Sequence, residues 1–410
     1  MSYIIDIPNT IRDHLKEHIE NIAKSEGFLK YKCDVQKKYK NGTNYLGEIT
    51  EVEIIGETII GAKEIRIFVK TKPSDGSIIK LLSINDVYSR ELYAYKELSE
   101  TYKQLQEEAN VPYEERYTFI KCYEESNIDT IILEDIGKLG YVNWNRLEII
   151  SIDFAQKCIK QLAKFHALSF VLEKDKLDYF NCNIKLLKYP FIFNDEYVAF
   201  LKNMYETCIN HLEGEYKAKL ESVLDICEKY YQFVNNSSVI RCLCHGDYRA
   251  MNIMMKYNNG EPSDVIPLDY QFIFYGSPVI DILYFIFGST DSKFRREHLQ
   301  NLKNLYHETM KEFLEYFKMD INLYYPRKEF DKAYEESLEF GLMVAVWYLP
   351  VNLADSDEVL DLNKTSLADA SFSANERVKA RLEDILDDFT EWGVFKTDTT
   401  TDALPDTKCM

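Results

Sequence analysis

Near the start of the chain, apolar residues recur first with the period of a helix and then with the period of strands. Residues 9–27, "NTIRDHLKEHIENIAKSEG", begin with residues able to cap a helix and end in glycine, which predicts an amphipathic helix. Its apolar face is formed by Ile11, Leu15, Ile19 and Ile22. The runs "EITEVEII" (48–55) and "EIRIFVK" (64–70) are rich in β-formers and are predicted to be strands.

A second helix and two more strands are predicted in the next 70 or so positions. An apolar stripe follows residues 86–109 and comprises Tyr88, Leu92, Tyr95, Leu98 and Leu105. The runs "RYTFIKCYE" (116–124) and "TIILED" (130–135) flank a turn and are predicted strands. The first 135 residues are therefore expected to form a β-β-α-β-β unit after a helical lead-in.

Beyond Gly137 the periodicity becomes mainly helical. Helices are predicted over residues 151–170, 195–234, 292–318, 329–348 and 374–392. The strong strand signal of this half lies in residues 242–271. Residues 396–410 are polar and aperiodic, and we expect them to form a disordered tail.

These elements predict an α+β protein with two lobes. We expect a small β-rich lobe over residues 1–136, with an antiparallel sheet and a helix, and a larger, mainly helical lobe over residues 137–395. The chain has 410 residues, of which 46% are hydrophobic and 29% charged, and this suits two lobes around a large core.

The charge of the chain narrows the classes of partner. Its formal net charge is -19, whereas a surface for nucleic acid or anionic lipid normally shows a basic excess. The longest apolar run, residues 340–351, is too short to span a bilayer, and the N-terminus lacks the pattern of a signal peptide. We therefore expect no nucleic-acid partner and no membrane partner. A few local lysines, amides and metal ions could still hold a phosphorylated ligand.

The cysteines indicate a reducing compartment. The chain has nine, an odd number, and no CxxC pair or Cys/His cluster has the spacing of a zinc site. We expect reduced thiols and a cytoplasmic protein.

Residues 242–271, "CLCHGDYRAMNIMMKYNNGEPSDVIPLDYQ", place polar side chains among apolar runs. The runs "NIMMKY" and "VIPLDYQ" flank a segment rich in Asn, Gly, Pro and Asp, which predicts a β-hairpin. With its loop centred near Gly260, Asn252 faces Asp269, and opposite residues of an antiparallel pair have Cβ atoms about 5 Å apart. An amide oxygen and a carboxylate at that spacing are suitable ligands for Mg²⁺.

Asp247 stands in the predicted turn that follows the strand "VIRCLC". Gly246 beside it can adopt backbone angles closed to other residues, so the turn can hold Asp247 near the same cation and facing a substrate hydroxyl. An Asp there can orient the hydroxyl and accept its proton during phosphoryl transfer. His245 is expected to stabilise the turn rather than to act as a catalyst. Alone, each feature also fits an ordinary polar turn; their combination is far more specific.

Phosphoryl transfer also needs a cation on the nucleotide phosphates. Lys70 ends a predicted strand of the small lobe, and Glu91 lies in the first turns of the next helix. A Lys held by a Glu on a neighbouring helix is the pairing that kinases use. Taken singly, Lys70 could be a solvated lysine at a strand end, and Glu91 a solvated glutamate on a helix. Because both precede the Asp-x4-Asn segment in the order found in kinases, the kinase pairing is favoured.

Two backbone segments are candidates for nucleotide contacts. The segment "KNGTNYLGEI", with Gly42, Asn44 and Gly47, is neither GxGxxG nor a Walker A motif, but its amides could cover phosphates. "LEDIG" lies at the lobe boundary, where backbone groups of Glu134 and Ile136 could pair with an adenine edge. A plain hinge explains "LEDIG" equally well.

Other polar and aromatic residues allow two interpretations each. Asp281, in "FYGSPVIDILYFIFG", is set among apolar residues and needs partners; it either hydrogen-bonds the catalytic turn or caps its own helix. His166 is more easily explained as a core histidine. Trp347 and Tyr348 either belong to the core or line an apolar substrate pocket.

The segments "CHGDYRAMNIMMKY", "PLDYQFIFYGSPVIDILYFIF", "LEDIGKLGY" and "LAKFHALS" resemble the ecdysteroid kinase-like family of insects, related to the choline and aminoglycoside kinases. The resemblance extends over residues 35–395 and implies a protein-kinase-like fold and an ATP-dependent phosphotransferase for a small-molecule hydroxyl, with ecdysteroids as substrates of founding members. It implies these roles: Asp247 as base, Asn252 and Asp269 as metal ligands, Lys70 on the phosphates, Glu91 holding Lys70, and Asp281 bracing the turn.

The chain departs from the family pattern at several positions. Family members commonly have an aromatic residue where this chain has Arg249, and Tyr248 precedes it here. The glycine-loop segment keeps Asn44 and Tyr45 of a "GENYAS"-like pattern but not the rest. "LDYQ" lacks the glycine of Asp-Phe-Gly, and no Ala-Pro-Glu follows, which speaks against a protein substrate.

The sequence thus predicts a small-molecule kinase that uses ATP and Mg²⁺ and phosphorylates a hydroxyl group, with a steroid alcohol as one candidate acceptor. The alternatives are a kinase-fold binding module without turnover, and a kinase for another small alcohol of the choline or aminoglycoside kind. A helical scaffold with an incidental hairpin is a third reading, and it predicts no stabilisation by ATP and Mg²⁺.

Overall fold

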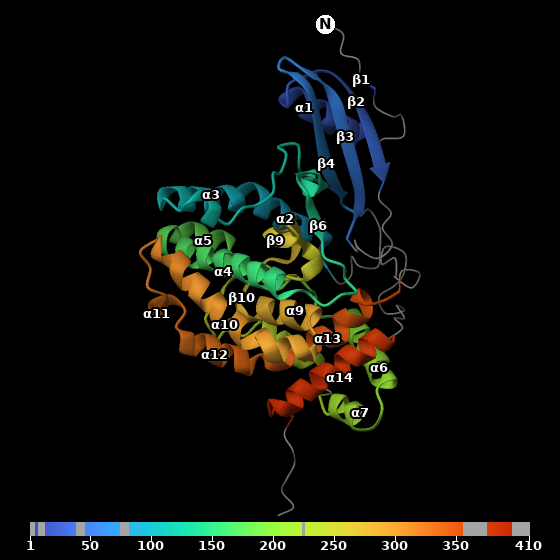
Figure 1. Cartoon of the computed structure of the whole chain (residues 1–410), viewed down its shortest axis with the longest axis vertical. Helices are drawn as coiled ribbons and strands as arrows, with labels where there is room; N and C mark the ends of the chain where they lie inside the picture. The colour runs from blue at the N-terminus through green and yellow to red at the C-terminus, as the bar shows by residue number, and fades with distance from the viewer. Residues whose placement is uncertain are drawn as a thin grey trace, which may run out of the picture.

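The computed structural model describes residues 5–6, 13–37, 46–73, 82–223, 226–355 and 375–395. Figure 1 shows a β-sheet with one covering helix at the N-terminal end and a larger body of helices beneath it. The expected α+β architecture of two lobes is therefore confirmed. The predicted disordered tail, 396–410, lies outside the described residues.

The sheet of the small lobe has five strands in the order β1-β2-β3-β4-β5, with β1 and β2 parallel and the other neighbours antiparallel. The strands are β1 (Ile5–Asp6), β2 (Phe28–Lys37), β3 (Glu48–Thr58), β4 (Gly61–Thr71) and β5 (Thr130–Glu134). The predicted strands 48–55 and 64–70 form one long hairpin, in which Thr58 pairs with Gly61. The strands β1 and β2 were not predicted.

One face of this sheet is buried by helix α1 (Asp13–Ser25), which lies within the helix predicted for residues 9–27. Because side chains alternate along a strand, residues two apart share the buried face. The cluster between helix and sheet includes Leu15, Ile19, Ile22, Val52, Ile54, Ile67 and Val69.

Residues 116–124 do not form the predicted regular strand. They make only an isolated bridge between Cys122 and Leu133. Two backbone bonds extend it, from Tyr123 N to Ile132 O at 2.9 Å and from Glu134 N to Lys121 O at 2.9 Å. This segment therefore pairs with β5 at a few positions and does not form a continuous ladder of hydrogen bonds with it.

The long helix of the small lobe has a π-helical turn in its middle. It consists of α2 (Ile84–Tyr93), the π turn η2 (Ala94–Leu98) and α3 (Ser99–Glu108), close to the predicted 86–109. Ser83 caps it, accepting a bond from the N–H of Asp86 at 3.4 Å. Its apolar face belongs to the hydrophobic cluster of the helical lobe and not to the cluster under α1. The helix therefore ties the two lobes together.

The helical lobe contains eleven α-helices among the described residues. They are α4 (Ile152–Asp175), α5 (Leu177–Asn183), α6 (Asp195–His211), α7 (Gly214–Glu221), α8 (Ile226–Val234), α9 (Val279–Ser289), α10 (Ser292–Glu315), α11 (Ile321–Tyr324), α12 (Arg327–Glu336) and α13 (Leu338–Asn352), followed by α14 (Glu376–Glu391) as an eleventh. Each helix predicted for this half is confirmed. The range 195–234 divides into three helices, and Ser337 separates α12 from α13.

Short strands and single helical turns make up the remaining elements. They are the 3₁₀ turns η3 (Tyr113–Glu115), η4 (Ile136–Leu139), η5 (Ala250–Asn252) and η6 (Tyr270–Phe272) and the strands β6 (Tyr141–Asn143), β7 (Cys242–Cys244), β8 (Ile253–Asn258), β9 (Glu261–Pro267) and β10 (Phe274–Gly276). β8 and β9 form the predicted hairpin with β6 on its edge, and β7 pairs with β10.

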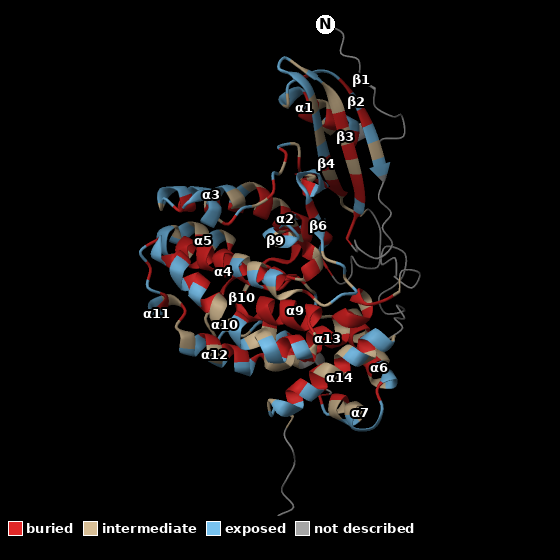
Figure 2. Ribbon diagram, in the orientation of Figure 1, coloured by how far each residue is buried: buried red, intermediate tan, exposed pale blue. Residues whose placement is uncertain are grey.

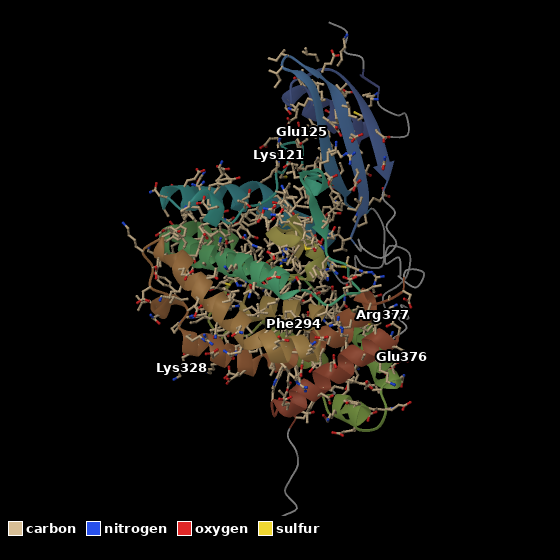
Figure 3. The ribbon with its side chains drawn as sticks, viewed as in Figure 1. Lys121, Glu125, Phe294, Lys328, Glu376 and Arg377 are labelled. Atoms are coloured by element: carbon tan, nitrogen blue, oxygen red, sulfur yellow. The ribbon has the colours of Figure 1, made fainter. Side chains whose placement is uncertain are left out.

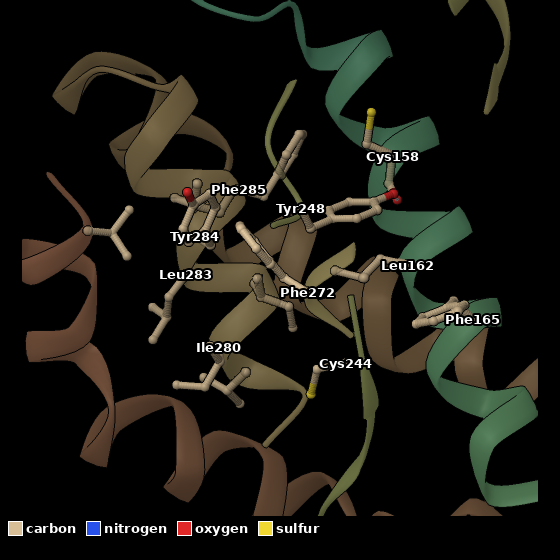
Figure 4. Close-up of a cluster of buried hydrophobic side chains, with 14 of the residues drawn as sticks. Cys158, Leu162, Phe165, Cys244, Tyr248, Phe272, Ile280, Leu283, Tyr284 and Phe285 are labelled. Atoms are coloured by element: carbon tan, nitrogen blue, oxygen red, sulfur yellow. Dashed lines mark hydrogen bonds between the residues drawn. The ribbon is translucent and has the colours of Figure 1, made fainter. Parts of the chain in front are cut away.

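Helix α9 lies at the centre of the large lobe. All of its residues are buried, and it is coloured accordingly in Figure 2. Figure 4 shows Tyr248 between α4, which carries Cys158 and Leu162, and the aromatic side chains of α9. The Tyr248 hydroxyl donates to the carbonyl of Cys158 at 2.6 Å. The segment after β7 is thus fixed against both helices.

The C-terminal helix is attached to the end of α13. Arg377, labelled in Figure 3 at the start of α14, pairs with Asp355 at 2.9 Å. Asn375 donates to the carbonyl of Leu353 at 2.8 Å. Among the described residues, no helix has the length and apolar character needed to cross a membrane.

Candidate active site

The turn that carries Asp247 follows β7 and depends on Gly246. This glycine has φ +80°, and a Cβ there would lie 2.1 Å from the carbonyl oxygen of Phe272. Only glycine accepts both the left-handed backbone and the close approach. The sequence-based expectation that Gly246 shapes this turn therefore has a geometric basis.

Asp281 of α9 holds the same turn from behind. Its Oδ2 accepts from the N–H of His245 at 2.6 Å, and its Oδ1 accepts from the N–H of Gly246 at 2.8 Å. His166 of α4 lies behind Asp281, with Nε2 3.0 Å from Asp281 Oδ2 and Nδ1 2.7 Å from the Tyr306 hydroxyl. All of these groups are buried. A buried polar group is costly without a hydrogen-bond partner, and here each side chain has one. Of the two interpretations of Asp281, the bond to the turn is the observed one.

His245 links the turn to the hairpin. Its Nε2 lies 3.1 Å from the carbonyl oxygen of Leu268, and burial lowers the pKa of the imidazole. A neutral imidazole that donates through Nε2 fits this carbonyl. His245 therefore connects the turn to the residue that follows β9.

Asp247 is buried, and its side chain contacts an amide and a guanidinium. Asn252 Nδ2 donates to Asp247 Oδ2 at 2.8 Å and to the Asp247 carbonyl at 3.0 Å. Arg249 Nε lies 3.3 Å from Asp247 Oδ2. Burial raises the pKa of the Asp247 carboxyl to about 6, although Arg249 and Asn252 act in the opposite direction. The group is therefore closer to neutral pH than an exposed aspartate.

The hairpin register differs by one residue from the prediction. Asn252 stands opposite Leu268, whose N–H donates to the Asn252 carbonyl at 2.7 Å, and not opposite Asp269. The tip is the two-residue turn Asn259–Gly260, and a bulge beside Lys256 shifts the register. Asp269 follows the strand in the left-handed region, with φ +68°. Asn252 and Asp269 nevertheless line one cavity.

Lys70 of β4, in the small lobe, contacts two residues of the helical lobe as well as Glu91. Its Nζ lies 2.7 Å from Glu91 Oε2, 2.7 Å from Asp269 Oδ1 and 3.0 Å from Gln271 Oε1. Burial alone would lower the pKa of Lys70, but the charges of Asp269 and Glu91 outweigh it and raise that pKa. Lys70 is therefore a fixed positive charge.

The two carboxyl groups beside Lys70 differ. Burial favours a higher pKa for Asp269, but the charge of Lys70 outweighs it and holds the pKa of Asp269 below its usual value. Burial raises the pKa of Glu91 to about 7 against the opposing charge of Lys70. Of the two carboxyl groups beside Lys70, Asp269 is therefore the one that ionises more readily.

Helix α2 is anchored so that Glu91 points at Lys70. The guanidinium of Arg90, the preceding residue, donates to the carbonyls of Ile273 at 2.8 Å and Lys188 at 2.6 Å, both in the helical lobe. One turn further on, the Tyr95 hydroxyl accepts from the N–H of Asp269 at 3.2 Å. The helix thus positions Glu91 and Asp269 relative to each other.

A cavity of about 720 Å³ opens beside these groups, between the sheet and the helical lobe. Its lining includes six of the predicted site residues: Lys70, Glu91, Glu134, Ile136, Asn252 and Asp269. Asp247 does not line it and is connected to it through Asn252. Asn44 and Gly42 lie outside the described residues, and Gly47 has φ +111°.

Three residues of the site were not predicted from the sequence. Gln271 bridges Lys70 and Asp269, since its Nε2 lies 3.3 Å from Asp269 Oδ2. Tyr95 was placed only in an apolar stripe, and Arg249 only as a departure from the family pattern. The "LDYQ" motif contained Gln271, but its two-residue spacing from Asp269 gave no sign that both side chains meet one lysine.

The residues present fit a magnesium ion. Asn252 donates to Asp247 through Nδ2, and its Oδ1 makes no hydrogen bond with the described residues. Asp269 adds an ionised carboxylate on the same cavity. Mg²⁺ is commonly bound by one or two carboxylates or amide oxygens together with substrate phosphates.

A sheet lobe joined to a helical lobe, with a lysine held by a helix glutamate, is the arrangement typical of kinases. The model of the ecdysteroid kinase-like family matches residues 41–319, and the chain belongs to that family.

Solved structures that are similar to this chain are also small-molecule kinases. The Plasmodium vivax ethanolamine kinase is 12% identical, with 85% of this chain and 82% of that chain covered and a TM-score of 0.36. The streptomycin–ATP complex of APH(2")-IIa is 14% identical, with coverages of 88% and 98% and a TM-score of 0.36. The GDP complex of aminoglycoside 2'-phosphotransferase-IIIa is 11% identical, with coverages of 92% and 100% and a TM-score of 0.37.

At TM-scores of this size, the family assignment rests on the sequence match and not on these structures. No curated protein matches the chain at a significant level.

Proposed function

We propose that the protein transfers the γ-phosphate of ATP to a hydroxyl group of a small molecule, with Asp247 as the base. The observation that carries this proposal is the buried amine of Lys70 beside the cavity. It contacts the carboxyl groups of Glu91 and Asp269, two residues far from it in the sequence. A buried cluster of two carboxylates and one lysine is expensive to desolvate, and its position fits phosphate binding better than a purely structural role.

The nucleotide is assigned to the cavity. Lys70 reaches the phosphates, Glu91 holds Lys70, and backbone groups of Glu134 and Ile136 meet the base. Asn252 and Asp269 hold Mg²⁺, which neutralises charge on the phosphates when bound. Asn44 is assigned to the covering of the phosphates on sequence grounds alone.

The chemical step follows from the position of Asp247. The acceptor hydroxyl oxygen bonds to the γ-phosphorus while the bond from that phosphorus to the β,γ-bridging oxygen breaks, and ADP leaves. The hydroxyl proton passes to the Asp247 carboxylate. Asn252 keeps the carboxylate oriented through Oδ2, and Asp281 and His245 keep the turn in place.

The family name supports a steroid alcohol as the acceptor, because ecdysteroids are steroid alcohols. Tyr284 interacts with the Asp247 carboxyl and packs with Trp347 and Tyr348, with ring centroids 5.5 to 5.9 Å apart. Such a group suits a rigid apolar skeleton. We place the reaction in the cytoplasm, in keeping with the free thiols of the described cysteines.

The proposal is tested by measuring ADP release with ATP and Mg²⁺ against steroid alcohols, choline, ethanolamine, aminoglycosides and sugars, and by mass spectrometry for the gain of one phosphoryl group. Turnover should be lost in Asp247→Asn and kept in Asp153→Asn, an exposed aspartate in the first turn of α4. Normal turnover of Asp247→Asn would reject the base. ATP binding without any acceptor-dependent ADP would favour the binding module.

A further inference from the structure

Arg249 is a largely buried positive charge directly beside the proposed base. It lies two residues after Asp247, its side chain is only 13% exposed, and its Nε is 3.3 Å from Asp247 Oδ2. A carboxylate at the acceptor site would by itself attract ammonium groups. With Arg249 in place, the charge of Asp247 is compensated.

Arg249 faces the helical lobe and not the nucleotide cavity. It is not among the residues that line the cavity. Its guanidinium lies 5.7 Å from the ring centroid of Tyr348 on α13, a cation–π arrangement. The Tyr348 ring in turn contacts Tyr284 of α9. Arg249 therefore contacts both Asp247 and helix α13 and lies outside the nucleotide cavity.

Two buried nitrogen atoms in this group make no hydrogen bond to the described residues. They are Nε of Arg249, which is close to Asp247 but not aligned for a hydrogen bond, and Nε1 of Trp347. The Trp347 ring lies 5.7 Å from that of Tyr284 and 5.9 Å from that of Tyr348. Buried donors are usually hydrogen-bonded, so the two donors of this aromatic group are available to oxygen atoms of a ligand.

We propose that Arg249 determines the class of acceptor: its guanidinium, assisted by the indole N–H of Trp347, binds an oxygen of the acceptor, so that the site takes neutral or acidic alcohols and rejects alcohols that carry an ammonium group. This rests on the proposed function, because it assigns the acceptor side of the same base. It separates this site from one for choline, ethanolamine or aminoglycosides.

The test measures binding and therefore does not need turnover. Calorimetry is done with a non-hydrolysable ATP analogue and Mg²⁺, and with three skeletons: a hydroxysteroid, a hexose and a short-chain diol. Each skeleton is used as the neutral alcohol, a carboxylate derivative and a primary amine derivative. In the wild-type protein, any skeleton that binds should bind at least about tenfold more weakly as the amine than as the neutral alcohol.

Variants then assign the effect to Arg249. Arg249→Gln should abolish the tenfold difference, and Arg249→Lys should retain it, because Lys keeps the charge. The matched control is Arg241→Gln: Arg241 also stacks on a tyrosine, 4.6 Å from the Tyr275 ring centroid, but at the other end of β7 from Asp247. It should leave the charge discrimination unchanged.

Three results overturn the proposal: equal or tighter binding of the amines by the wild-type protein, unchanged discrimination in Arg249→Gln, or binding of none of the nine compounds. The comparison of amines with neutral alcohols in the wild-type protein tests the proposal even where a variant fails to fold. The proposed function fails separately, through the absence of acceptor-dependent ADP. Phosphorylation of amino alcohols would reject the inference and leave the function standing.

Discussion

Asp247 combines burial with a neighbouring guanidinium, and this sets the pH range in which it can accept a proton. Its pKa is raised to about 6, so the carboxyl becomes protonated as the pH falls through that value and can no longer act as a base. We expect log(kcat/KM) to fall with unit slope below about pH 6 and to be flat above it. Steady-state assays from pH 5 to 8 measure this.

The same profile tests the contribution of the neighbouring charge. Arg249 lowers the pKa of Asp247, so Arg249→Gln should move the acidic limb to higher pH. Two results would contradict the assignment of Asp247 as the titrating base. One is an acidic fall in kcat/KM at the same pH in Arg249→Gln as in the wild-type protein. The other is wild-type activity that stays constant down to pH 5.

Gln271 is the residue for which the structure adds most to the sequence. It accepts from Lys70 at 3.0 Å and approaches Asp269 Oδ2 with its Nε2. Hydrogen bonds to charged groups contribute about 1.5–3 kcal/mol, so Gln271→Leu should weaken ATP binding about 10- to 100-fold. Gln300→Leu, on the exposed face of α10, is the control. An unchanged KM for ATP in Gln271→Leu would show that Lys70 is held well enough by its carboxylates.

At the residue scale, the sequence predicted side chains whose chemistry is specific to their motif. Lys70, Glu91 and Asp269 were predicted from a strand end, a helix start and a hairpin, and they meet at 2.7 Å. Gln271 and Tyr95 were missed for a physical reason. Glutamine and tyrosine are ordinary residues on buried surfaces, and only the folded backbone shows which atom they reach.

At the scale of elements, the turn after β7 depends on one glycine. Gly246→Ala forces a Cβ to 2.1 Å from the Phe272 carbonyl and an unfavourable φ, so we expect a loss of about 1–3 kcal/mol of stability and at least about a 100-fold fall in kcat. Gly260→Ala is a matched control, since Gly260 has φ +87° but open space at the Cβ position. Denaturation and kinetics of both variants should separate backbone strain from displacement of Asp247. Equal kcat in the two variants would contradict the argument.

Helices and strands were predicted well where the spacing of apolar residues follows the buried face of the element. The helix that became α4 and the hairpin of β8 and β9 each carry a long, regular pattern. The hairpin register was off by one, because the turn lies at Asn259–Gly260, earlier than predicted, and the bulge beside Lys256 offsets only part of that difference. Residues 116–124 have the composition of a strand, but whether a partner is available is decided by tertiary packing.

At the scale of the whole molecule, the proposed nucleotide site joins the two lobes. Lys70 comes from the sheet, Asn252 and Asp269 come from the helical lobe, and all three line the cavity. Arg146, on the same cavity, donates to the carbonyls of Asn352 and Ala354 at the end of α13. A ligand bound there contacts both lobes and is connected to the C-terminal helices.

MgATP should therefore stabilise the protein as one unit. At a concentration 100 times its Kd, a ligand that binds only the folded state adds about 2.7 kcal/mol to the free energy of unfolding. We expect urea denaturation with ATP and Mg²⁺ to show that increase with a single transition, and EDTA to remove most of it because Asn252 and Asp269 need the cation to hold the phosphates. Asp269→Asn should lose the stabilisation, whereas Asp153→Asn should keep it. Equal stabilisation by ATP with and without Mg²⁺ would mean that Lys70 alone binds the phosphates, and stabilisation in Asp269→Asn would remove this residue from the metal site.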